Sequence, residues 1–100
     1  MAIMNARTNL MSDAYLKGYI NTLTKRVREL NSMYMDNNSV IGSPIDSLLV
    51  YSEIDFLRIA DLFNLKIAKD ELPEGFSCRY LFKVSYGGVE FQTFTDEELI

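Results

Sequence analysis

The chain has 100 residues, of which 48% are hydrophobic and 24% are charged, and its net charge is −4 with a pI near 4.7. This length and composition predict a single globular domain and exclude an intrinsically disordered chain. The sequence has no histidine and only one cysteine, which excludes an internal disulfide, Cys/His zinc sites, four-cysteine sites, and Ser–His or Cys–His nucleophiles.

The distribution of charged and apolar residues argues against nucleic acid and membranes as partners. Residues 1–30 carry a net charge of +3, whereas residues 31–100 carry −7. An acidic chain is a poor candidate for direct binding to nucleic acid phosphates. No apolar run reaches the roughly 18–20 residues that span a bilayer, and the N-terminus lacks the pattern of a secretory signal. We therefore expect a cytoplasmic protein with no membrane partner.

Residues 11–34 are predicted to form a long amphipathic helix. Serine and asparagine are favourable helix caps, so Ser12 or Asn9 can cap its start, and the asparagines at 37–38 mark its end. Its apolar positions recur at alternating intervals of four and three residues. They are Leu16, Ile20, Leu23, Val27, Leu30 and Tyr34.

This apolar stripe has two interpretations. Tyr19 and Met33 fall beside it and make it wider than the seam of a coiled coil, which favours packing within the domain. The alternative is self-association of two copies through the same stripe, giving a homodimer.

Two further segments, residues 43–51 and 52–64, are predicted to be helical. Ser43 and Ser52 are each followed three residues later by an aspartate, which resembles a capping box, and Pro44 suits a first helical position. Asn64 is expected to end the second segment. The apolar face of that segment consists of Phe56, Ile59, Ala60 and Phe63. The segments are predicted to form either two short helices or one helix kinked near Ser52.

The C-terminal part predicts strands. The apolar residues at 65–68 favour a short strand, and residues 69–75 a loop. Polar and apolar residues then alternate as in a half-buried strand, with one face made of Cys78, Tyr80, Phe82, Val84 and Tyr86. Cys78 is therefore interpreted as a small core residue and not as a nucleophile.

Gly87 and Gly88 are predicted to form the turn of a hairpin between residues 78–86 and 89–95. Glycine readily adopts the positive φ angles that such turns require. A two-residue turn pairs Tyr86 with Val89 and Val84 with Phe91 on one face of the hairpin. On the other face it pairs Leu81 with Phe94 and Arg79 with Asp96. A phosphate-binding loop would need a following helix and a lysine–hydroxyl pair, which this segment lacks.

Several groups of residues are candidate functional sites. A helix-turn-helix within residues 43–64 would present Arg58 among acidic residues and would be repelled by DNA. The acidic residues of the loop and the C-terminus form a solubilising surface, a hard-cation site without the EF-hand pattern, or a patch that binds a basic groove on a partner. Together with two tyrosines of the first helix they are the candidate partner-binding residues, namely Glu71, Glu74, Asp96, Glu97, Glu98, Tyr15 and Tyr19. No catalytic, cofactor-binding or metal-binding residue is predicted.

The C-terminal 40 residues resemble small proteins of bacteriophages and prophages of Gram-positive bacteria. The resemblance lies in the hairpin pattern of Tyr86, Gly88, Val89 and Phe91. In size and acidity the chain is also similar to phage inhibitors of host defence, including anti-CRISPR proteins, a group without a common motif. The resemblance implies a host protein as partner, such as a nuclease or another nucleic-acid-binding protein.

We therefore expect an α+β domain with a long N-terminal helix, one or two short helices, and a C-terminal antiparallel hairpin or three-stranded sheet. The favoured function is a non-enzymatic protein-binding module, an anti-CRISPR-like inhibitor that acts through an acidic surface. The alternative is a small dimeric DNA-associated transcriptional regulator that uses Lys25 and Arg28 of the first helix.

Overall fold

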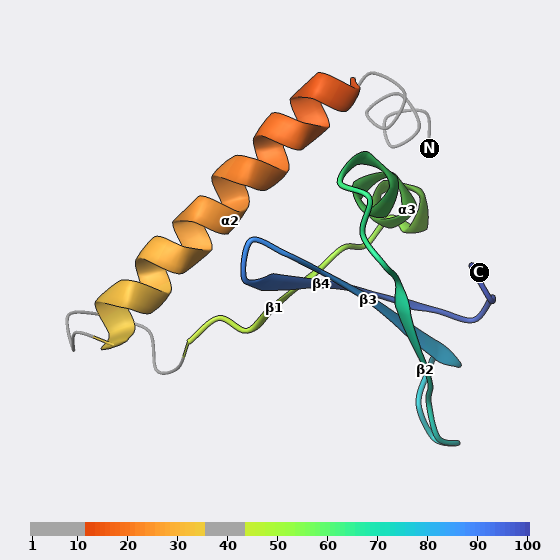
Figure 1. Cartoon of the computed structure of the whole chain (residues 1–100). Coiled ribbons are helices and arrows are strands. Elements are labelled where there is room, and N and C mark those ends of the chain that lie inside the picture. Colours follow the sequence, from red (N-terminus) through yellow and green to blue (C-terminus); the bar gives the residue numbers. More distant parts are fainter. Residues whose placement is uncertain (1–11, 36–43) are drawn as a thin grey trace.

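In the part of the chain that the structure describes, two helices pack on one four-stranded sheet in an α+β arrangement (Figure 1). The computed structural model describes residues 12–35 and 44–100. The elements are α2 (Asp13–Met35), β1 (Ser47–Leu49), α3 (Glu53–Leu62), β2 (Ala68–Glu71), β3 (Tyr80–Tyr86) and β4 (Val89–Thr95). The predicted fold class is confirmed, although the sheet has four strands and includes one parallel pair.

Helix α2 forms where the apolar stripe predicted it. The Ser12 hydroxyl accepts a hydrogen bond of 3.1 Å from the Tyr15 backbone N–H, so the predicted cap at Ser12 is present. The predicted cap at Asn9 and the predicted end of the helix at residues 37–38 lie outside the described residues. Leu16, Ile20 and Val27 are buried, so the stripe packs within the domain.

The helix predicted for residues 43–51 is wrong, because this segment contains strand β1. Ser43 lies outside the described residues, and Ser47–Leu49 pair in parallel with Glu90–Gln92 of β4. The Val50 N–H continues this pairing by donating to the Gln92 carbonyl at 2.7 Å. The local sequence favours a helix here, but the backbone conformation is determined by pairing with β4. Each residue of β1 pairs with the residue that lies 43 positions later in the chain.

Helix α3 begins and ends close to the predicted positions. The Ser52 hydroxyl accepts a hydrogen bond of 3.2 Å from the Asp55 N–H, as expected for a helix cap. Asn64 follows the helix with a φ of 53°, which is the left-handed conformation expected at its exit. Phe56, Ile59 and Ala60 are buried, whereas Phe63 is only half-buried.

The sheet has the order β1-β4-β3-β2, with β2 and β1 at its edges. Strand β2 starts at Ala68, so the strand predicted at 65–68 is displaced into the segment predicted as a loop. Its position is set by antiparallel pairing with β3, from Ala68 opposite Lys83 to Glu71 opposite Tyr80. An ion pair across this ladder, with Lys83 Nζ 2.8 Å from Asp70 Oδ2, supports the same register.

The predicted hairpin register is confirmed from Tyr86 opposite Val89 to Leu81 opposite Phe94. The expected pairing of Arg79 with Asp96 lies beyond the ladder, which ends at Tyr80 opposite Thr95. Gly87 and Gly88 have φ angles of 61° and 80°, as a tight hairpin turn requires.

The turn of the hairpin lies against α2. The Arg28 guanidinium donates a 2.8 Å hydrogen bond to the Gly87 carbonyl, and the Tyr86 hydroxyl donates one to Asn21 Oδ1. These contacts attach the middle of the helix to the sheet.

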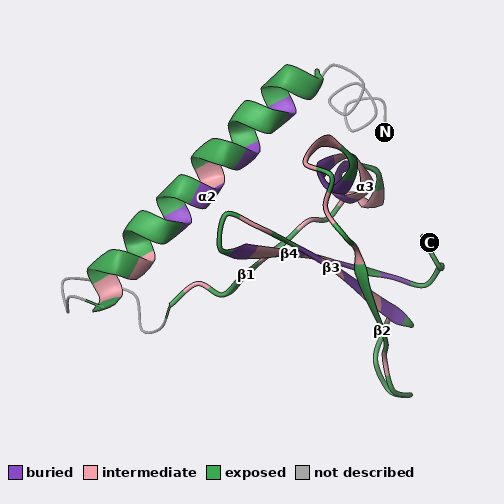
Figure 2. Cartoon of the chain, viewed as in Figure 1, coloured by how far each residue is buried: buried purple, intermediate pink, exposed green. Residues whose placement is uncertain are grey.

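The core lies between the helices and one face of the sheet (Figure 2). Strands β3 and β4 contribute alternate residues to it, as their patterning predicted. Its strand residues are Tyr80, Phe82, Val84, Val89 and Phe91, together with buried Thr93 and Thr95. Cys78 precedes β3 and is half-buried, so it lies outside the core to which it was assigned.

Candidate functional site

Two surfaces of the molecule are candidates for binding, and the first is an acidic end of the sheet. Strands β2 and β4 are both antiparallel to β3, so their C-terminal ends lie at the same end of the sheet. Glu71 ends β2 and Glu74 follows it, whereas Asp96, Glu97 and Glu98 follow β4. The fold therefore places the two predicted acidic segments at the same end of the sheet, beyond strands on either side of β3. We call Glu71, Glu74, Asp96 and Glu97 the acidic end.

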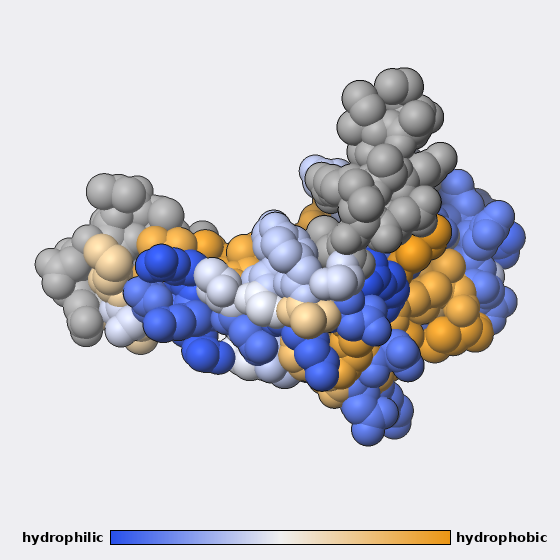
Figure 3. All heavy atoms as spheres, turned by 90° about the horizontal axis from the view of Figure 1, so that it is seen from above, coloured by the Kyte–Doolittle hydropathy of each residue, from blue (hydrophilic) through white to orange (hydrophobic). Residues whose placement is uncertain are grey.

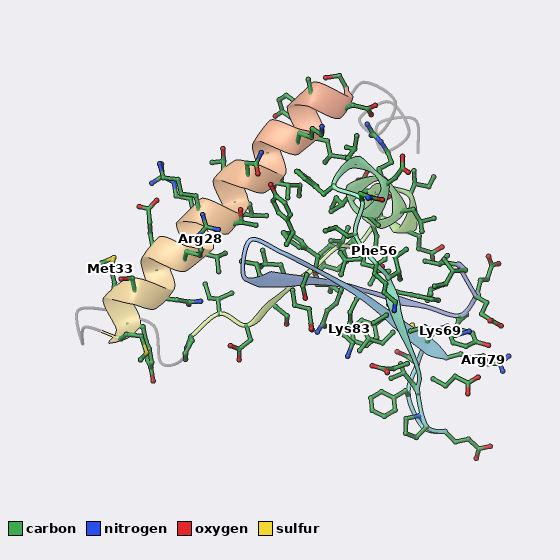
Figure 4. All side chains as sticks on the ribbon, viewed as in Figure 1. Arg28, Met33, Phe56, Lys69, Arg79 and Lys83 are labelled. Carbon is green, nitrogen blue, oxygen red and sulfur yellow. The ribbon has the colours of Figure 1, made fainter. Side chains whose placement is uncertain are left out.

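Glu98 belongs to the same segment but is neutralised by a lysine. Its Oε2 lies 2.5 Å from the Lys69 Nζ. The hydrogen bond from Lys69 lowers the pKa of the Glu98 carboxyl, and the same hydrogen bond raises the pKa of Lys69. Arg79 also lies at this end of the sheet, with its guanidinium 5.6 Å from the centre of the Tyr80 ring (Figure 4).

The four carboxylates of the acidic end are exposed, and within residues 12–35 and 44–100 none of them forms an ion pair. Their charges are therefore available to a partner. In the same ranges no three acidic or cysteine side chains are grouped so that they could hold a metal ion.

The predicted tyrosines do not lie at the acidic end. Tyr15 and Tyr19 project from the N-terminal half of α2, with 62% and 51% of their surface exposed. The hairpin turn is the end of the sheet that contacts α2, whereas the acidic end is at the far end of both hairpin strands. The predicted partner-binding residues therefore form two separate surfaces.

The tyrosines line the second surface, which is a groove of about 720 Å³. It is lined by α2, by the segment from Leu48 to Ser52, and by Asp55 and Ile59 of α3. Most of the side chains in the groove are apolar. Those contributed by α2 and the sheet are Leu16, Ile20, Leu23, Leu48, Val50 and Phe91.

Among the described residues that line this groove, Asp55 alone carries a charged side chain, and its position there was not predicted from the sequence. Only 9% of its surface is exposed, and its Oδ1 has no hydrogen-bond partner among the described residues. The sequence identified Asp55 only as the third residue of a capping pattern. Its N–H makes the expected bond to Ser52, yet this carboxylate oxygen stays unpaired. Nothing in the sequence distinguishes such an oxygen from one that completes the cap.

The stripe proposed for self-association is mostly used inside the domain. Leu23 and Tyr34 are half-buried, and Leu30 is 41% exposed. Since the remaining three positions of the stripe are in the core, pairing between copies through the whole stripe would require the helix to leave the sheet. Figure 3 shows hydrophilic side chains along the surface of α2.

The basic residues of α2 are only partly free for nucleic acid. Arg28 is held by the Gly87 carbonyl, and the guanidinium of Arg26 lies 3.9 Å from the Glu29 carboxylate. Lys17 and Lys25 are exposed. These contacts leave few cations for the DNA-binding alternative, which stays a prediction.

Within the described residues, no helix has both the length and the apolar character needed to span a membrane. Comparison of the chain with protein-family models, with curated proteins and with solved structures found no match.

Proposed function

We propose that this chain is a non-enzymatic protein-binding module whose acidic end binds a basic surface of a partner protein. The observation that carries the proposal is the position of Glu71, Glu74, Asp96 and Glu97 at one end of the sheet, where they are exposed and form no ion pair with any described residue. Complementary charge of this kind accelerates association and orients the two partners.

The rigidity of the strands supports this role. Glu71 is fixed by its rung opposite Tyr80, and the Thr95 hydroxyl accepts a 3.0 Å hydrogen bond from the Glu97 N–H just beyond β4. Because Glu71 belongs to a paired strand and Glu97 lies just beyond one, little backbone entropy is lost when a partner binds these two carboxylates.

The proposed partner is a host protein with a basic, nucleic-acid-binding groove, such as a defence nuclease. Exposed carboxylates at one end of a small domain can imitate the phosphates that such a groove binds. The chain would then act in the cytoplasm of a host cell as a mobile-element inhibitor, in keeping with the similarity in size and acidity noted above.

The test is affinity capture from host lysate with three forms of the full chain, followed by mass spectrometry. The first is the wild type and the second is Glu71→Gln/Glu97→Gln. The third is Asp46→Asn/Asp61→Asn, which changes net charge equally at exposed sites away from the acidic end. A nucleic-acid-binding protein should be retained by the wild type and the third form, and lost from the second.

Loss of the partner from both variants would show that only net charge matters and would contradict the proposal. Retention by all three forms would also contradict it, because the acidic end would then not be the contact surface. A retained nuclease should in addition be inhibited by the wild type and not by Glu71→Gln/Glu97→Gln.

A further inference from the structure

We propose that the groove between α2, β1 and α3 binds a peptide segment of another protein in which one lysine or arginine is flanked by apolar side chains. This surface is separate from the acidic end, so the inference goes beyond the proposed function. It depends on the chemistry of the groove walls, on Asp55, and on the edge of β1.

The walls of the groove favour apolar side chains. Leu16, Ile20 and Leu23 face it from α2, and Leu48 and Val50 face it from the opposite wall. A volume of about 720 Å³ is within the range of pockets that bury most of a ligand's surface. Three exposed tyrosines, Tyr15, Tyr19 and Tyr51, line the groove as well. Tyrosine provides both apolar area and a hydroxyl in binding sites.

Asp55 determines the charge of the ligand. A buried carboxylate oxygen without a partner is unfavourable, because water has been removed and no donor replaces it. No lysine or arginine lines the groove in the part of the chain that the structure describes. Arg58 of α3 forms an ion pair with Asp13, with its Nη2 3.0 Å from the Asp13 Oδ1. Because Asp55 lines the groove, a cationic side chain that enters the groove would pair with its carboxylate.

The edge of β1 favours a peptide as the ligand. Among the strands of residues 12–35 and 44–100, β1 pairs only with β4, and the Val50 N–H points toward β4 to reach the Gln92 carbonyl. Backbone groups alternate in direction along a strand, so the amide and carbonyl of Leu49 point away from the sheet. A peptide backbone can pair with these groups, as in strand addition to a sheet edge.

The experiment is a selection from a displayed library of random 12-residue peptides against the full-length wild type, Asp55→Asn and Asp61→Asn. Asp61 is an exposed carboxylate on the same helix and serves as the matched control. Peptides selected by the wild type and by Asp61→Asn should carry one basic residue between apolar residues. Peptides selected by Asp55→Asn should lack this preference.

Affinities of the best peptide, fluorescently labelled, are then measured by polarisation. Asp55→Asn should raise Kd at least tenfold, whereas Asp61→Asn should change it less than twofold. Replacing the peptide's basic residue by methionine should weaken binding to the wild type tenfold and to Asp55→Asn hardly at all. Tyr19→Ala, which leaves the carboxylate in place, should also weaken binding, and circular dichroism verifies the folding of every variant.

Several results would overturn the proposal. These are selected peptides without a basic residue, equal effects of the two aspartate substitutions, or binding abolished by Glu71→Gln/Glu97→Gln instead. An Asp55-dependent dimer in sedimentation without peptide would assign the groove to a second copy of the chain and would equally overturn it.

Discussion

Gly87 in the hairpin turn provides a sharp test of how the sheet meets α2. A Cβ at this position would lie 2.9 Å from Arg28 Nη1 and 3.2 Å from Thr24 Cβ. A left-handed conformation costs a non-glycine residue about 1–2 kcal/mol. Displacing Arg28 also removes its hydrogen bond to the Gly87 carbonyl, which is worth about 1 kcal/mol. Gly87→Ala should therefore lower the free energy of unfolding by roughly 2–3 kcal/mol.

Gly88→Ala is the matched control. Gly88 also has a positive φ, of 80°, but a Cβ there would have no atom within 4 Å. Its substitution should cost only the backbone strain of about 1–2 kcal/mol. The difference of about 1 kcal/mol between the variants corresponds to a midpoint of thermal unfolding lower by about 4–8 °C for Gly87→Ala.

The assay is urea denaturation followed by circular dichroism, with Arg28→Ala added to complete a double-mutant cycle. In the Arg28→Ala background, Gly87→Ala should cost less than it does in the wild type. Equal costs for the two glycine substitutions, or a larger cost for Gly88→Ala, would refute the close contact between the turn and α2.

Three further predictions concern other contacts. Asn31→Ala removes both hydrogen bonds between this side chain and the Ile45 backbone, at 2.9 and 2.7 Å. The free energy of unfolding measured by urea denaturation should therefore fall by about 1–2 kcal/mol. An unchanged free energy of unfolding would contradict this attachment of α2. Asp55→Leu removes the penalty of burying an unpartnered oxygen, which is about 1–3 kcal/mol. It also removes a smaller favourable interaction with the helix dipole, of about 0.3–1 kcal/mol. It should therefore stabilise the protein, and destabilisation in the same assay would count against an unpaired Asp55. Lys69→Met should raise the pKa of Glu98 toward its ordinary 4.5 in a carboxyl NMR titration. Because the pKa is lowered in the folded protein, the stabilisation from this pair should be present above pH 4.5 and be lost as the pH falls below it.

Local patterns were sufficient to predict the hairpin and α3. The hairpin register follows from alternation around Gly87 and Gly88, and α3 from Ser52 and the left-handed exit at Asn64. In each case the residues that determine the structure are neighbours in the sequence.

Strand β1 could not be predicted in this way. Its segment carries a proline and a serine–aspartate pair that favour a helix start, and its strand conformation depends on β4, far away in the chain. Strand β2 was displaced for a related reason, since its limits are set by the rungs that it forms with β3. The sequence contains the partners of both strands but gives no local sign of the pairing.

The candidate site was predicted in part. The acidic segments were identified one by one, and the parallel orientation of β2 and β4 is what brings them to one end. The ion pair that neutralises Glu98 depends on Lys69 lying within β2, which was expected to be a loop. The burial of Asp55 likewise depends on contacts between α3 and the rest of the fold.

The most direct test of the central claim is an NMR titration of the ¹⁵N-labelled chain with the captured partner. Binding should broaden or shift the amide signals of residues 71–75 and 96–98 most strongly, and the affinity should fall as the salt concentration rises. Changes confined to the exposed face of α2, with the signals at the acidic end unaltered, would contradict the account.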